Sequence, residues 1–140
     1  MFETYLTVVG TVISDIVERS LPSGERVCRF RLVAQERRFD KQAQQWTDGD
    51  RVFIQVTCWR TLAEGVSASL AKGDQVVVTG RLHLNEYDVN GEARSMMELD
   101  ARAVGPNLAT CTAAVQRPKQ AQAMEGAMSD REITASTVAA

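Results

Sequence analysis

Histidine, cysteine and long apolar runs are all scarce in this sequence of 140 residues. The one histidine, His83, and the three cysteines, Cys28, Cys58 and Cys111, are too far apart to match the spacing of zinc ligands, so we expect no metal and no cofactor. An odd number of thiols also argues against a disulfide framework. No apolar run reaches the roughly eighteen residues of a membrane helix, and the N-terminus has no export signal. These absences predict a cytoplasmic protein without a membrane partner.

Composition changes once along the chain. Apolar alternation runs from Leu6 to about Val104, and Gly105-Pro106-Asn107 then interrupts it. Beyond Gln116 the residues are mostly Ala, Thr, Gln, Ser and Met, with little to bury. We therefore predict one domain over residues 1–110 and a short, largely disordered tail over 111–140.

The formal net charge is −2, which by itself does not suggest a nucleic-acid partner. The charges are unevenly distributed, however. Between Arg19 and Arg60 there are nine basic and five acidic residues, a local excess of four positive charges. This region predicts either a basic binding stripe or a solvated face with mixed ion pairs.

Most of the domain alternates apolar and polar residues with the period of a β-strand. The inward rows of the five expected strands are Leu6, Val8, Gly10 and Val12; Cys28, Phe30, Leu32 and Ala34; Val52, Ile54, Val56 and Cys58; Val76, Val78, Gly80, Leu82 and Leu84; and Met97, Leu99, Ala101 and Ala103. A polar loop is expected over Arg37 to Asp50 and a turn over Asp88 to Gly91.

The period changes after the third strand. Thr61-Leu62-Ala63-Glu64 matches a capping box, so it predicts the start of a helix that ends at Gly73. The order of elements is three strands, a helix and two strands. This order predicts an all-β protein with the OB-fold, a five-stranded Greek-key barrel with one helix between strands 3 and 4; a small β-sandwich is the alternative.

No pattern points to catalysis, because no positioned acid, base or nucleophile is visible, and we predict that the chain is not an enzyme. Binding has more support. Phe53 and Trp59 fall on the outward row of the third strand, about 20 Å apart at the usual rise per residue. Outward cations and further aromatics accompany them, namely Arg29, Arg31, Arg81, Trp46, Phe39 and Tyr87. Single-stranded nucleic acid needs aromatics for stacking and arginines for phosphates, although the same aromatics could instead cover an oligomer interface.

Residues from Thr7 to Pro106 resemble the bacterial single-stranded DNA-binding proteins, a family of OB-fold homotetramers without catalytic activity. The resemblance rests on short matches spread along the chain in order: Val8-Val9-Gly10 with Asp15, Pro22-Ser23-Gly24, Phe30 to Ala34, Trp59-Arg60, Lys72 to Val76, Gly80-Arg81-Leu82 and Glu98-Leu99. Phe39-Asp40-Lys41, Trp46 to Gly49 and Gly105-Pro106 look most like the actinobacterial branch.

The resemblance implies that Phe39, Phe53, Trp59 and Tyr87 stack on DNA bases. It also implies a homotetramer, and the uncharged outward row Tyr5, Thr7 and Val9 is the expected interface. The family's usual tail ends in an acidic tip that recruits replication or repair enzymes, whereas this sequence ends Ser136 to Ala140. The chain therefore resembles a specialised paralogue for which such recruitment is doubtful.

Two functions are compatible with these observations. The first is sequence-nonspecific binding and protection of single-stranded DNA in repair, recombination, stress response or DNA uptake, at the nucleoid. The second is an OB-fold module that docks on other proteins of a DNA-processing assembly.

Overall fold

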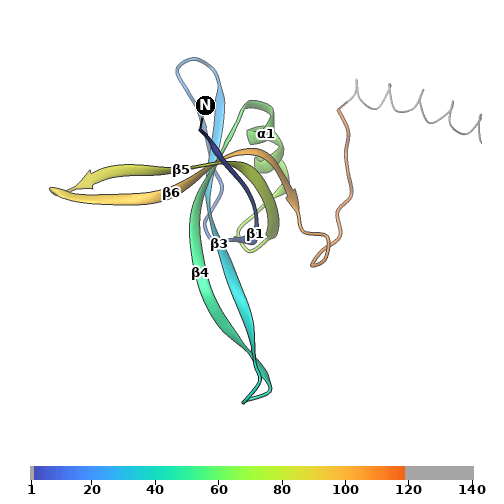
Figure 1. Cartoon of the computed structure of the whole chain (residues 1–140). Helices are drawn as coiled ribbons and strands as arrows, with labels where there is room; N and C mark the ends of the chain where they lie inside the picture. The colour runs from blue at the N-terminus through green and yellow to red at the C-terminus, as the bar shows by residue number, and fades with distance from the viewer. Residues whose placement is uncertain (1, 119–140) are drawn as a thin grey trace, which may run out of the picture.

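The computed structural model describes residues 2–118 and shows a small β-barrel from which two long hairpins project (Figure 1). Its elements, in chain order, are β1 (Thr4–Val12), β2 (Val17–Ser20), β3 (Arg26–Asp40), β4 (Gln45–Trp59), α1 (Arg60–Ser69), β5 (Gln75–Val89) and β6 (Glu92–Pro106).

The strands form a closed ring. The sheet order is β1-β5-β6-β4-β3-β2, and an additional pairing of β1 with β3 closes the barrel. All neighbours are antiparallel except β4 and β6, which are parallel. With α1 between β4 and β5, this is the OB-fold that the sequence predicts. Strand β2 was not expected; its four exposed residues carry no apolar alternation.

Most of the residues that apolar alternation predicts to point inward are buried in the core or packed against it. Cys28, Phe30 and Leu32 of β3 lie inside, opposite Cys58, Val56 and Ile54 of β4. Both Cys28 and Cys58 are fully buried, and their contact in the core raises the pKa of the Cys58 thiol; Cys111 is exposed. The remaining core residues are Val12, Val76, Val78 and Leu99, covered by Ala63 and Val66 of α1.

Four predictions of inward side chains are wrong, for two reasons. Val52, Leu84 and Met97 are exposed because their strands run past the rim of the barrel and continue as hairpins. Ala103 is exposed because the β5–β6 register shifts at Gly80, so that Ala101 and Val104, not Ala103, pack on the core.

The predicted polar loop over Arg37 to Asp50 is also wrong, because most of it is β-structure. β3 and β4 stay paired as far as Asp40 and Gln45. The tight turn between them is held by the Asp40 carboxylate, which accepts a hydrogen bond of 2.9 Å from the Gln42 amide. Both faces of this hairpin are exposed to water, so its sequence lacks the apolar row by which strands are recognised.

The helix is where the sequence predicts it, but its ends differ. α1 begins at Arg60, and no side chain forms a capping hydrogen bond, so the predicted capping box is absent. It ends at Ser69 rather than at Gly73. Gly73 has a positive φ of 99°, and its amide instead donates 2.8 Å to the Val12 carbonyl, which ties the turn before β5 to β1.

Candidate nucleic-acid interface

The outer face of the β3–β4 ladder presents aromatic and basic side chains together. Directly opposite pairs on this face are Val33 with Phe53, Arg31 with Gln55, Arg29 with Thr57, and Val27 with Trp59. We call Arg29, Arg31, Phe53 and Trp59 the aromatic–arginine face. It lies directly outside the core pairs, so a rigid ladder positions its side chains.

Both aromatic rings of this face are accessible. The exposed fraction is 46% for Phe53 and 40% for Trp59. Large apolar side chains that remain this exposed on a well-formed barrel indicate a binding surface when they gather on one side. The rise of a strand separates them by about 20 Å, with the two arginines on the neighbouring strand between them.

The cations of the aromatic–arginine face are available for a ligand. Within residues 2–118, neither Arg29 nor Arg31 forms an ion pair, whereas Arg26, Arg37, Arg38, Arg60, Arg81 and Arg94 all do. An unpaired guanidinium keeps its full charge and its donors for a phosphate. The pattern of ion pairs therefore separates the binding arginines from those that support the structure.

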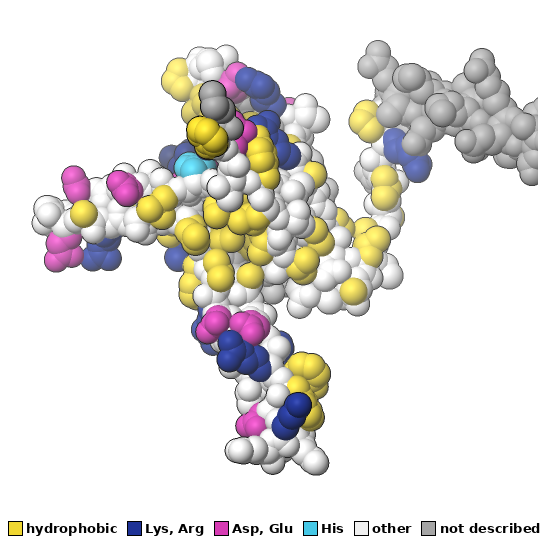
Figure 2. Space-filling view, viewed as in Figure 1, with side chains coloured by type: hydrophobic (Ala, Val, Ile, Leu, Met, Phe, Trp, Pro, Cys, Tyr) yellow, Lys and Arg dark blue, Asp and Glu magenta, His cyan; other side chains and the backbone are white. Residues whose placement is uncertain are grey.

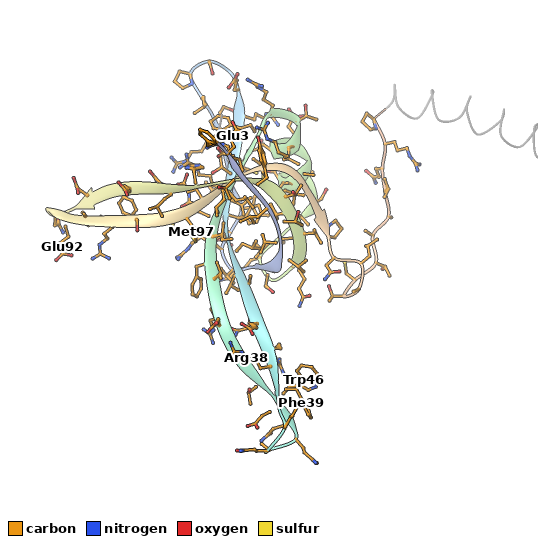
Figure 3. All side chains as sticks on the ribbon, viewed as in Figure 1. Glu3, Arg38, Phe39, Trp46, Glu92 and Met97 are labelled. Atoms are coloured by element: carbon orange, nitrogen blue, oxygen red, sulfur yellow. The ribbon has the colours of Figure 1, made fainter. Side chains whose placement is uncertain are left out.

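Phe39 and Trp46 lie together near the tip of the β3–β4 hairpin (Figure 3). Their ring centroids are 5.5 Å apart in an edge-to-face arrangement. Trp46 is the cross-strand partner of Phe39, which lies in the same row of β3 as Val33, the partner of Phe53. The register shift between Gln35 and Arg37 places an extra residue in β4 and thereby reverses its alternation. Phe39 and Trp46 therefore continue the side of the ladder that carries Phe53 and Trp59 toward the tip of the hairpin.

Ion pairs stiffen this hairpin below its tip. Arg38 contacts Glu36 at 2.9 Å and Asp50 at 3.5 Å. The hydrogen bond from Arg38 holds the pKa of the Glu36 carboxyl below its usual value. Residues 36–50 contain three basic and four acidic side chains, so the basic excess between Arg19 and Arg60 lies outside this hairpin.

Arg81 is in a different electrostatic state from Arg29 and Arg31. Its Nη2 atom lies 2.6 Å from Oδ2 of Asp100 on β6, and His83 Nε2 is 3.4 Å from the same oxygen. Arg81 does border the hollow beside Trp59, but with its charge neutralised.

Tyr87 lies on the β5–β6 hairpin, away from the aromatic–arginine face. It pairs with Arg94 and is 41% exposed, with Glu86 and Asp88 as its neighbours along β5. Figure 2 shows acidic side chains toward the end of this hairpin, and Glu92 marks its tip in Figure 3. Because side chains alternate along a strand, Arg94 lies on the same side as Tyr87, whereas Glu86 and Asp88 point to the other side.

Tyr5, Thr7 and Val9 form the outer row of β1, as predicted. Along β5 they face Arg81, Thr79 and Val77, and the two threonine hydroxyls are 3.0 Å apart. Tyr5 and Val9 are each more than half exposed. β1 pairs with β3 only at Thr11 and Val12, so its other edge is open from Thr4 to Gly10 within the described residues.

No arrangement for metal binding is present in residues 2–118, where no three His, Cys, Asp or Glu side chains form a possible metal site. The same part of the chain contains no helix long and apolar enough to cross a membrane.

A closed barrel with exposed aromatics and unpaired arginines on one face defines the class of oligonucleotide-binding OB-fold proteins. The model of the single-strand binding protein family matches residues 4–107, and the chain belongs to this family. This is a family of binding proteins and not of enzymes, as the sequence predicts.

Individual relatives are actinobacterial. A single-stranded DNA-binding protein of Corynebacterium glutamicum is 45% identical over 116 residues, which are 82% of this chain and 52% of that protein. The chain thus spans about half the length of this relative.

Two solved structures are similar. The small single-stranded DNA-binding protein of Streptomyces coelicolor has a TM-score of 0.73 and 40% identity over 79% of this chain and 99% of that one. The second single-stranded DNA-binding protein of Mycobacterium smegmatis has a TM-score of 0.68 and 40% identity, covering 83% of this chain and all of that one.

Arg102 is a candidate that the sequence reasoning missed. It is exposed, has no ion-pair partner within residues 2–118, and borders the same hollow as Trp59. The sequence places Arg102 on the outward row of β6, but it does not show that Trp59 of β4 lies nearby.

Proposed function

We propose that this protein binds single-stranded DNA without sequence specificity and protects it. The observation that carries the proposal is the aromatic–arginine face, where Phe53 and Trp59 are exposed and Arg29 and Arg31 are unpaired on one rigid ladder. Bases stack on the rings and phosphates bind the guanidinium groups, with no hydrogen-bond pattern that reads a sequence. Membership in the family and the names of its relatives support this function.

Phe39, Trp46 and Tyr87 extend the proposed interface along the two hairpins. A strand that leaves the aromatic–arginine face near Phe53 reaches the β3–β4 hairpin, where Phe39 and Trp46 offer a second stacking position. Tyr87 offers a further stacking position on the β5–β6 hairpin, on the same side as its cross-strand partner Arg94.

We also propose a homotetramer assembled through the outer row and open edge of β1. Unpaired edges of long strands are uncommon unless a partner covers them, and an uncharged row with two half-exposed apolar residues suits a symmetric contact. A protein with this activity works on cellular DNA, at the nucleoid in the cytoplasm, in repair, recombination, stress response or DNA uptake.

The test is a fluorescence titration with oligo(dT). Stacking of bases on Trp59 quenches its emission, and Trp59→Ala weakens binding by about 1 to 3 kcal/mol while circular dichroism shows the fold intact. Duplex DNA of the same length is the control ligand and binds far more weakly. An absence of binding to oligo(dT), with a folded protein, would favour the alternative of an OB-fold module that docks on other proteins.

A further inference from the structure

A hollow of about 580 Å³ opens beside Trp59, on the side away from Phe53. It is bordered by residues from five segments: Glu25 before β3, Trp59 at the end of β4, Arg60 and Leu62 of α1, Arg81 of β5, and Asp100, Ala101 and Arg102 of β6. Its size lies within the roughly 300–1,000 Å³ of sites that take small organic ligands.

The parallel pairing of β4 with β6 brings Arg102 to this hollow. The last pair in parallel register is Thr57 with Asp100, and Trp59 and Arg102, which follow shortly after it on the two strands, both border the hollow. The two residues are 43 positions apart in the sequence and meet only through this pairing.

One of the three arginines around the hollow has no acidic partner there. Glu25 is held by Arg60 at 3.0 Å, and Asp100 is held by Arg81 at 2.6 Å. Both carboxylates are therefore neutralised by their own arginines. Arg102 has no such partner among residues 2–118, so it carries the net positive charge of this site.

An aromatic wall next to one unpaired guanidinium suits one nucleotide of a single strand. We infer that Arg102 completes the nucleotide subsite at Trp59: a base stacks on the ring, as proposed above, and Arg102 binds the adjoining phosphate. The inference rests on the proposed function and extends the path of the DNA from the aromatic–arginine face across β6 toward α1.

A double-mutant cycle tests the subsite. Binding of a fluorescein-labelled oligo(dT) is measured by anisotropy, over a series of salt concentrations, for the full-length parent, Trp59→Ala, Arg102→Ala and the double variant. We expect Arg102→Ala to weaken binding at least threefold and to reduce the salt slope by about 0.7. In the Trp59→Ala background, the same substitution should weaken binding much less, because the phosphate is no longer positioned.

Two controls make the result specific. Lys72→Ala removes an exposed cation beyond the other end of α1 and should change affinity and salt slope less than Arg102→Ala. Arg102→Lys keeps the charge and should restore most of the slope. Equal effects of Arg102→Ala in the two backgrounds, or an effect no larger than that of Lys72→Ala, would overturn the subsite while leaving DNA binding intact. Failure of the parent to bind oligo(dT) would instead overturn the proposed function itself.

Discussion

Two outer faces of the same barrel, built from the same kind of strand, differ in how their charges are used. On β3 and β4, Arg29 and Arg31 have no ion-pair partner within residues 2–118, and two aromatic rings stand beside them. On β1, β5 and β6, Arg81 is bound to Asp100, and hydroxyl and apolar groups surround the pair. Whether each arginine already forms an ion pair is therefore a better indication of phosphate binding than the number of arginines on a face. We assign the first face to DNA and, on the second, the outer row of β1 to self-association.

The largest expected effect is on assembly. Val9→Glu places a carboxylate in the proposed contact between copies, where burying an unpaired charge costs several kcal/mol. Light scattering after size exclusion should show a tetramer for the parent and a smaller species for this variant at micromolar concentration. Arg29→Glu, on the other face, should leave the mass unchanged. If light scattering shows that the parent protein is a monomer, the β1 face is not an interface between copies of the chain.

Removal of the ring at Phe53 is the next effect in size. Phe53→Ala should weaken binding of oligo(dT) by about 1 to 3 kcal/mol, because one stacking position is lost. Leu108→Ala truncates another exposed apolar side chain, outside the barrel, and should leave the affinity as it is. Equal affinities of the parent and Phe53→Ala would show that this side of the ladder does not stack on DNA.

The salt dependence of binding distinguishes paired from unpaired arginines. Arg29→Ala and Arg31→Ala should each reduce the slope of log affinity against log salt by about 0.7, the value for one phosphate contact on a single strand. The sequence predicts the same for Arg81, but its ion pair with Asp100 leads us to expect a smaller change for Arg81→Ala. If all three variants lose the same slope, pairing in the free protein does not decide which arginine contacts DNA.

The smallest effect is expected for the tail, which belongs to neither face. Residues 119–140 lie outside the described part of the structure, so the prediction of a disordered tail over 111–140 is carried by the sequence. Residues 111–140 contain three basic and three acidic side chains, so their net charge is zero. Truncation after Gln116 should change the affinity for oligo(dT) by less than about 0.5 kcal/mol. Pull-downs should recover no replication or repair enzyme through this segment; recovery that is lost on truncation would reveal a docking signal.

Several features of the fold were predictable because they depend on local periodicity. Alternation of apolar residues set Phe30, Leu32 and Val56 inside and Phe53 and Trp59 outside, and the structure agrees. The polar hairpin over Arg37 to Asp50 was not predictable in this way, because both of its faces are exposed to water and its strands therefore show no apolar row. Leu84 and Met97 were misplaced because alternation does not show where a strand leaves the barrel.

Where a strand runs along the barrel without a register shift, the sequence by itself determined which side chains point outward, because the two-residue period of a strand is a property of neighbouring residues. The sequence did not determine which residues those side chains contact. Arg81 reaches Asp100 nineteen positions away through the register of β5 and β6, and Arg102 comes beside Trp59 only through the parallel pairing of β4 with β6. Register between distant strands depends on the closure of the whole ring, so the tertiary structure alone decided which arginines are neutralised and which remain for a phosphate.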